Sequence, residues 1–240
     1  MSGNLQDCDI PAELIRFELP LVNVATQFDR KKLVKIVAIG SSSTEGDGAS
    51  SQAFAYPSRL EAALRLRLPD QSITVLNKGK GGEEAQDELL RFDSDVLAEA
   101  PSLVIWQVGT NAVWKGYDLD NVAAAIAAGL ARLSGLAVDV VMMDLQYAPA
   151  VLRPDAVIAA TTRMVALIAE AAAKANANVF RRFALMRHWH LDDQIPFDRM
   201  ISNFDGNELH QNDWSYNCIA EALTVAITGA ATGPSRSAAR

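Results

Sequence analysis

Four short segments of this 240-residue chain carry polar side chains whose types and spacing suit chemistry. The first runs from Gly40 to Gly46, follows an apolar stretch and is rich in hydroxyl groups around Ser42. At a strand-to-helix turn, the partial positive charge of a helix N-terminus favours the anion that develops in acyl transfer. The turn therefore suits a serine nucleophile. It would also suit a helix cap or a phosphate site.

The other three segments offer hydrogen-bond donors and a base. Residues 77–82 hold three glycines in four positions, so backbone N–H groups there can approach a substrate closely. In residues 109–112, the amide of Asn111 can donate into a crevice, and residues 205–210 end in a histidine. Taken singly, each segment also fits an ordinary loop, with a turn-forming asparagine or a structural histidine.

Taken together and in this order, the segments resemble the four blocks of the SGNH (GDSL-like) hydrolase family. The matching residues are Ser42, Gly82, Asn111 and His210, and the resemblance spans about residues 33 to 227. It implies hydrolysis of a small acyl or acetyl ester through an acyl-enzyme on Ser42, with His210 as the base. It also implies an oxyanion hole made by the backbone of Ser42 and Gly82 and the side chain of Asn111, without a cofactor.

Three positions depart from the family pattern. Ser41 and Ala112 stand where the family usually has aspartates, although neither is the nucleophile or the amide donor. Asn207 stands where the family usually has its acid, three residues before the histidine, and Asp205 lies two residues earlier. An asparagine can hold the imidazole but has no charge to stabilise imidazolium. Asp205 and Asn207 are thus both candidates to orient the histidine, with Glu208 or a backbone carbonyl as further alternatives.

Several other side chains near these segments are candidates for binding. Gln146 and Tyr147 are expected to face the same crevice and contact the substrate, unless they are ordinary loop residues. Trp114, Trp189 and Trp214 would wall an acyl or sugar pocket or pack in the core.

One cluster has the residue types of a metal site. His188 and His190 form a His-x-His pair, with Asp192 and Asp193 close behind. Such a pair is unspecific, and serine hydrolysis needs no metal. We expect neither a metal nor another cofactor.

The elements that must position these segments follow from hydrophobic patterning. Short apolar runs predict strands at residues 33–39, 73–76, 103–107, 138–143 and near 179–183. Helices are expected from residue 57, at 85–97, from 118, at 155–174 and from 213 to about 227. This alternation predicts a three-layer α/β/α sandwich around a flavodoxin-like, five-stranded parallel sheet of order 2-1-3-4-5. Ligands of such sheets bind where strand order reverses, between the first and third strands.

The length fits one domain, expected at residues 32–228. Residues 1–31 lack sustained periodicity and are expected to be an arm that packs on the domain. Residues 229–240 are small and polar and are expected to be a disordered tail. Cys8 and Cys218 permit one disulfide between the arm and the last helix, or two buried thiols.

Composition limits the remaining possibilities. Half of the residues are apolar, and the formal net charge of −7 is spread along the chain, which argues against nucleic acid as a partner. The chain has no run of eighteen apolar residues that would predict a membrane span, and its first residues lack a signal-peptide pattern.

We expect a soluble protein, cytoplasmic or exported after loss of a leader, that acts on a small-molecule or glycan ester. Its oligomeric state stays open. The alternative is a non-catalytic flavodoxin-like or degenerate SGNH domain that binds a phosphate-bearing or acylated ligand.

Overall fold

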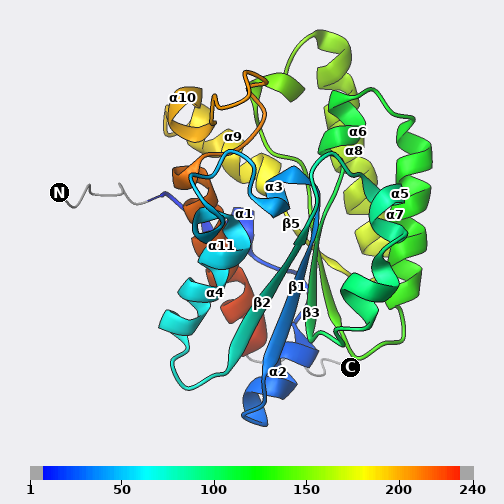
Figure 1. The fold of residues 1–240 in the computed structure, drawn as a ribbon, viewed down its shortest axis with the longest axis vertical. Coiled ribbons are helices and arrows are strands. Elements are labelled where there is room, and N and C mark those ends of the chain that lie inside the picture. The colour runs from blue at the N-terminus through cyan, green and yellow to red at the C-terminus, as the bar shows by residue number, and fades with distance from the viewer. Residues whose placement is uncertain (1–7, 233–240) are drawn as a thin grey trace, which may run out of the picture.

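A five-stranded parallel sheet forms the centre of the computed structural model, which describes residues 8–232 (Figure 1). Its strand order is β2-β1-β3-β4-β5. The strands are β1 (Val34–Gly40), β2 (Ile73–Gly79), β3 (Leu103–Gln107), β4 (Asp139–Met143) and β5 (Asn178–Phe180). All neighbouring strands pair in parallel, so the predicted fold class and strand order are confirmed.

Helices cover both faces of the sheet (Figure 1). One layer holds α1 (Ala12–Ile15), α2 (Val22–Asp29), α4 (Tyr56–Arg67), α9 (Arg182–Leu191) and α11 (Asp213–Thr232). The other layer holds α5 (Ala85–Leu89), the π-helical segment η2 (Asp93–Leu97), α7 (Leu119–Leu133) and α8 (Asp155–Lys174). Shorter helical pieces lie in the connections: α3 (Ser42–Glu45), η1 (Gln52–Phe54), α6 (Thr110–Trp114), η3 (Pro149–Val151) and α10 (Phe197–Met200).

The central strand β1 shows why the chain folds in three layers. Successive side chains of a strand point to opposite faces. Val34, Ile36 and Ala38 pack into the core beneath α4 and α11, whereas Val37 and Ile39 pack into the core beneath α7 and α8. A strand with two apolar faces needs a helical layer on each side, which is the usual state of parallel sheets.

Several helical pieces differ from the sequence-based expectation. Helices α6, α9 and α10 were not predicted, because α6 and α10 are too short to show a 3.6-residue apolar repeat and α9 has a mixed polar and apolar sequence. The expected helix at 85–97 is instead two pieces, α5 and η2. The last helix continues to Thr232, so residues 229–232 of the expected tail are helical. Residues 233–240 lie outside the described residues.

The N-terminal arm packs on the sheet from residue 8 onward, and its first seven residues lie outside the described range. Leu21, Val24 and Phe28 are buried in the core of the α4 layer. A disulfide joins Cys8 to Cys218 of α11, with 5.7 Å between their Cα atoms. The arm is therefore fixed to the domain both by apolar burial and by a covalent bond.

Helix α8 is the one helix in the described range that is long and apolar enough to cross a membrane. Its 18-residue window has a mean hydropathy of 1.6, although we expected no span because no uninterrupted apolar run exists. The helix is Ala-rich, and its Met164, Ile168 and Ala172 pack against the sheet. Only 22% of the window is buried in the structure, and a single helix of this length and composition is weak evidence for a membrane span.

Candidate active site

The serine turn, residues 40–46, lies at the carboxyl end of β1, where α3 begins (Figure 1). Gln107, the last residue of β3, fixes this turn. Its Oε1 accepts hydrogen bonds from the backbone N–H of Ser41 and from the hydroxyls of Ser41, Ser43 and Thr44, at 2.9–3.1 Å. Three hydroxyls are thereby held inward, and Ser42 is the serine of the turn that does not bond Gln107.

Strand β2 approaches the serine turn at a point that only glycine can occupy. A Cβ built on Gly79 would lie 2.0 Å from the backbone nitrogen of Glu45. Just beyond, the backbone N–H of Gly81 donates to the Glu45 carboxylate at 2.5 Å. The glycine-rich loop after β2 is therefore bound to the serine turn. This agrees with the expectation that loops following neighbouring parallel strands lie close together.

Ser42 and His210 lie in hydrogen-bond contact. The Oγ of Ser42 is 2.9 Å from the Nε2 of His210, and the Nδ1 of the same ring is 2.9 Å from Oδ2 of Asp205. The exposed fractions of Ser42 and His210 are only 7% and 6%. With Nδ1–H donating to the carboxylate, Nε2 is left to accept the serine hydroxyl proton. The three side chains form one continuous hydrogen-bonded chain.

Of the two candidates to orient the imidazole, Asp205 makes the contact. The backbone and side-chain N–H groups of Asn207 both donate to the Asp205 carboxylate, at 3.0 Å. Although partial burial opposes ionisation, these bonds and the adjacent His210 lower the pKa of Asp205. Asn207 thus supports the acid, while Glu208 pairs with Arg153.

The predicted oxyanion donors lie on two loops that are fixed to each other. The side-chain amide of Asn111 donates to the carbonyl of Glu83 at 2.7 Å, and Lys115 Nζ donates to the carbonyl of Gly82 at 2.7 Å. Within residues 8–232, the backbone N–H groups of Ser42 and Gly82 donate to no protein acceptor. Two backbone donors and one remaining N–H of the Asn111 amide are therefore left for a ligand.

A buried glutamate that the sequence reasoning missed organises the Asn111 loop. The Glu84 carboxylate accepts from the backbone N–H groups of Ala85, Gly109 and Ala112, at 2.8–3.0 Å. Burial raises the pKa of Glu84, and the three N–H bonds oppose that rise. The family's aspartate is absent at position 112, and the Glu84 carboxylate binds the backbone N–H of that same residue.

Arg182 links the serine turn to the histidine loop from beneath. It is fully buried, and its Nη1 donates to Ser43 Oγ at 3.0 Å and to Gln211 Oε1 at 3.4 Å. Its Nε donates to the carbonyl of Asp144 at 3.0 Å. Burial lowers the pKa of Arg182 to about 10 and raises the pKa of Asp144 to about 7. One guanidinium thus holds the residues adjacent to both Ser42 and His210.

Gln146 and Tyr147 do not face an open crevice as expected. Gln146 is buried, and its amide contacts Thr110 and the carbonyl of Leu209. Tyr147 packs against Phe183, His190 and Phe197. The chain turns inward after β4, which no local pattern in the sequence indicates. Their expected contact with substrate therefore has no support in the geometry.

The three tryptophans have different surroundings. Trp189 is fully buried and packs edge-on against Trp214, with 5.4 Å between the ring centres. Trp214 also lines an open groove next to the histidine loop. Trp114 is partly exposed at the end of α6. Of the three, Trp214 is thus placed to wall a pocket, as expected for an acyl or sugar site.

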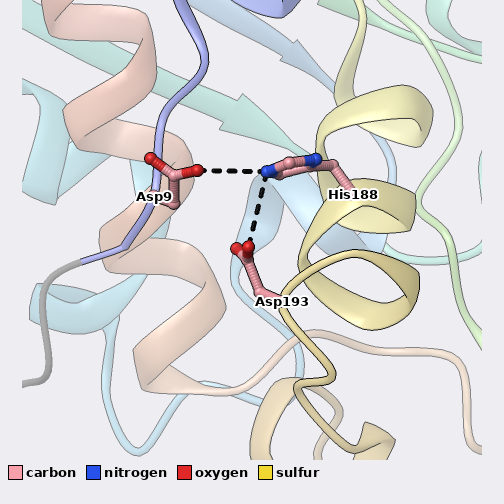
Figure 2. A group of neighbouring side chains, drawn as sticks. All are labelled: Asp9, His188 and Asp193. Atoms are coloured by element: carbon pink, nitrogen blue, oxygen red, sulfur yellow. Dashed lines mark hydrogen bonds and ion pairs between the residues drawn. The ribbon is translucent and has the colours of Figure 1, made fainter.

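The metal-type cluster contains one histidine rather than two. The Nε2 of His188 lies 3.1 Å from Asp9 and 3.6 Å from Asp193 (Figure 2). Its Nδ1 lies 2.9 Å from Asp192. His190 instead bonds a backbone carbonyl. Although partial burial opposes protonation, the Asp9 and Asp192 carboxylates raise the pKa of His188. The cluster is thereby an ion-pair network that ties the N-terminal segment to α9.

Comparison with known proteins adds to this geometry. An acetylxylan esterase of Geobacillus stearothermophilus is 33% identical over 93 residues, which are 35% of this chain. The matched stretch spans only 42% of that relative's length.

Solved structures share the fold. A two-domain esterase (CEX) active on acetylated mannans superimposes with a TM-score of 0.73 at 16% identity, over 93% of this chain and 57% of that one. A catalytic mutant of Axe2, an acetylxylan esterase from Geobacillus stearothermophilus, gives a TM-score of 0.69 at 20% identity, over 81% and 94% of the two chains. At these identities the likeness concerns the fold.

A family model that matches nearly the whole chain shows which family the protein belongs to. The model of the Non-GDSL lipase-like family covers residues 7–233, which include the serine turn, both loops of the oxyanion donors and the histidine loop. The resemblance to SGNH (GDSL-like) hydrolases that the four sequence segments indicated is thereby confirmed. The chain belongs to the Non-GDSL lipase-like family.

Proposed function

We propose that this chain hydrolyses small carboxylic esters, acetyl esters of carbohydrates above all, through an acyl-enzyme on Ser42. The observation that carries the proposal is the continuous hydrogen-bonded chain from Asp205 through His210 to Ser42. Nucleophile, base and acid in this order are the arrangement that serine hydrolases use on unrelated folds. The acetylxylan esterase and the acetylated-mannan esterase among the similar proteins support the acetyl and carbohydrate parts of the proposal.

In the first half-reaction, His210 Nε2 takes the hydroxyl proton as Ser42 Oγ attacks the ester carbonyl carbon. The ionised Asp205 carboxylate stabilises the imidazolium that forms. The tetrahedral intermediate then collapses, the bond to the alcohol oxygen breaks, and His210 returns its proton to that oxygen. The alcohol leaves, and the acyl group remains on Ser42.

The negative charge on the former carbonyl oxygen is met by three donors. These are the backbone N–H groups of Ser42 and Gly82 and the free N–H of the Asn111 amide. Each such donor contributes roughly 3 kcal/mol to the transition state when it is held in place beforehand. The bonds from Asn111 to Glu83 and from Lys115 to Gly82 supply that rigidity.

In the second half-reaction, water replaces the alcohol. His210 takes a proton from the water as it attacks the acyl carbon, and then returns the proton to Ser42 Oγ as the acid departs. The same base and the same donors serve both halves. The proposed steps use only the side chains and backbone N–H groups described.

The competing proposal of a phosphate site fits the serine turn poorly. Ser41, Ser43 and Thr44 would be the natural hydroxyl donors to a phosphate, yet all three donate to Gln107. The fourth hydroxyl, on Ser42, contacts His210. A phosphate would therefore find no free hydroxyl donor on the turn, whereas an ester carbonyl needs only N–H donors beside a nucleophile.

Hydrolysis of p-nitrophenyl acetate by the wild type and by Ser42→Ala tests the proposal. We expect the alanine variant to lose roughly 10⁴-fold or more in kcat while its circular dichroism is unchanged. Ser94→Ala, at an exposed serine remote from the turn, is the matched control and should retain full activity. Equal activity in Ser42→Ala and the control would refute the nucleophile. A wild type that binds acetylated sugars without turnover would favour a degenerate, non-catalytic domain.

A further inference from the structure

An open groove of about 740 Å³ lies beside the Ser42–His210 pair. We call it the Phe204 groove. Two segments line it: residues 46–52, which follow α3, and residues from the histidine loop and the start of α11. The second set consists of Ser202, Phe204, Asn212, Asp213 and Trp214. The groove is thus built by the two chain segments that carry the nucleophile and the base.

Two lining residues of the groove, Asp47 and Phe204, lie close to the His210 ring that would protonate the leaving alcohol. Asp47 Oδ2, on the groove wall, lies 4.0 Å from the Nε2 of His210. The centre of the Phe204 ring lies 5.6 Å from that of the His210 ring. Gly48 adopts a positive φ of 87°, and a Cβ there would lie 2.3 Å from the carbonyl oxygen of Gln211. Its absence lets the groove wall run directly against the histidine loop.

The chemistry of the lining combines an aromatic face with neutral polar groups. Phe204 is 61% exposed, so its ring is open to contact with a ligand in the groove. Hydroxyl and amide groups share the groove with it: Ser51, Gln52, Ser202 and Asn212. Such groups donate and accept hydrogen bonds, and an aromatic ring packs against C–H groups. A sugar ring presents both kinds of surface, whereas a long alkyl chain would leave the polar groups unpaired.

The charged residues of the groove indicate whether it favours neutral or acidic sugars. Among the described residues that line it, the charged ones are Asp47 and Asp213, and none is Lys or Arg. Asp213 is fixed by the backbone N–H and hydroxyl of Ser50, at 2.8 and 2.6 Å. Arg199 contacts the ring of Trp214 at 5.6 Å without lining the groove. An anionic alcohol would therefore enter next to two carboxylates, and none of the described lining residues is a cation that could balance its charge.

We infer that the Phe204 groove binds the alcohol portion of the ester and selects neutral, polyhydroxylated sugars over acidic ones. The inference rests on the proposed function, since it assigns the groove to the leaving group of that reaction. Phe204 supplies the stacking surface, and Asp47 and Asp213 supply the repulsion of anionic sugars.

A comparison of two substrates on one variant tests the stacking role. Phe204→Ala should raise KM for acetylated xylotriose about 10-fold, which corresponds to the loss of one aromatic contact. Its kcat and KM for methyl acetate, whose one-carbon alcohol has no ring to stack on Phe204, should change less than about 2-fold on the same reasoning. Leu66→Ala removes another exposed apolar side chain, from α4, and should leave both substrates unaffected. An equal loss on both substrates would overturn the inference, because Phe204 would then act only on His210.

The charge role is tested with matched neutral and acidic esters. The wild type should prefer acetylated xylotriose over an acetylated galacturonate trimer in kcat/KM, and added salt should shrink that preference as it screens the carboxylates. Asp213→Asn should narrow the preference by improving the acidic substrate. A preference that neither salt nor Asp213→Asn alters would contradict the charge argument.

Binding without turnover separates this inference from the proposed function. Calorimetric titration of the Ser42→Ala protein with xylotriose should give a heat of binding that is lost in the Ser42→Ala, Phe204→Ala double variant. Binding that is lost in this way supports the groove even if Ser42 proves not to be the nucleophile. Unchanged binding in the double variant would refute the groove even if the wild type is an esterase.

Discussion

Asp205 and His210 meet through one hydrogen bond, with 2.9 Å between Oδ2 and Nδ1. Four residues separate them, two more than in the family's usual spacing of acid and histidine. Gly206 in between adopts a positive φ of 71°, and both N–H groups of Asn207 bind the carboxylate. The longer loop therefore folds back on itself, so that an acid five positions before the histidine reaches the same ring atom.

The first prediction concerns this acid. Asp205→Asn should lower kcat for p-nitrophenyl acetate by roughly 10⁴-fold, because the imidazolium loses its negative partner. Asn207→Ala should cost far less, about 10-fold, because it removes only the side-chain bond to a carboxylate that stays in place and keeps the backbone N–H bond. Steady-state kinetics on both variants measure the difference. A larger loss in Asn207→Ala than in Asp205→Asn would reverse the assignment.

A second prediction concerns the oxyanion donor. Asn111→Ala should lower kcat about 100-fold with little change in KM, because its bond strengthens mainly in the transition state. Asn121→Ala, an exposed asparagine on α7, is the control and should behave as wild type. If KM rose instead and kcat stayed unchanged, Asn111 would contact the bound substrate in its ground state and would not stabilise the oxyanion.

The buried Asp144 gives a prediction on stability against pH. Burial raises its pKa from 3.8 to about 7, so the folded chain holds a proton that the unfolded chain releases. The stabilisation from this proton is fully present below the pKa that Asp144 has in the unfolded chain. It is lost as the pH rises through the pKa that Asp144 has in the folded chain. Between pH 5 and 8, the free energy of unfolding of the wild type should fall by about 2 kcal/mol more than that of Asp144→Asn. Urea unfolding at several pH values measures this, and parallel pH curves would contradict the raised pKa.

The disulfide gives a prediction that is independent of chemistry at Ser42. Cys8 and Cys218 are 210 positions apart, and a bond that closes so long a loop restricts the unfolded chain strongly. Cys8→Ser should therefore lower the free energy of unfolding by about 2–5 kcal/mol. A reductant should lower the melting temperature of the wild type and leave that of Cys8→Ser unchanged. An equal response of both proteins would argue that the bond does not form in solution.

The order of the strands could be predicted because each apolar run is bounded by glycine or polar residues and alternates with helical repeats. The same patterning placed Ser42 and His210 at neighbouring loops. In contrast, the choice between Asp205 and Asn207 depends on the path of one loop, which packing determines and local sequence does not indicate.

The residues that sequence reasoning missed share a physical cause. Gln107, Glu84 and Arg182 act through hydrogen bonds to backbone or hydroxyl groups that are distant along the chain. A buried polar side chain is recognised by its partners, and those appear only once the chain is folded. The inward packing of Gln146 and Tyr147, which fits the alternative of ordinary loop residues, could not be predicted for a related reason: the end of a strand does not indicate which way the next side chains turn.

Covalent labelling of Ser42 tests the central claim most directly. We predict that a fluorophosphonate reacts with the wild type at one equivalent and that peptide mass spectrometry places the adduct on Ser42. His210→Ala should slow the labelling strongly, because the hydroxyl then keeps its proton. Labelling of another residue, or none in a folded wild-type protein, would contradict the assignment of Ser42 as the nucleophile.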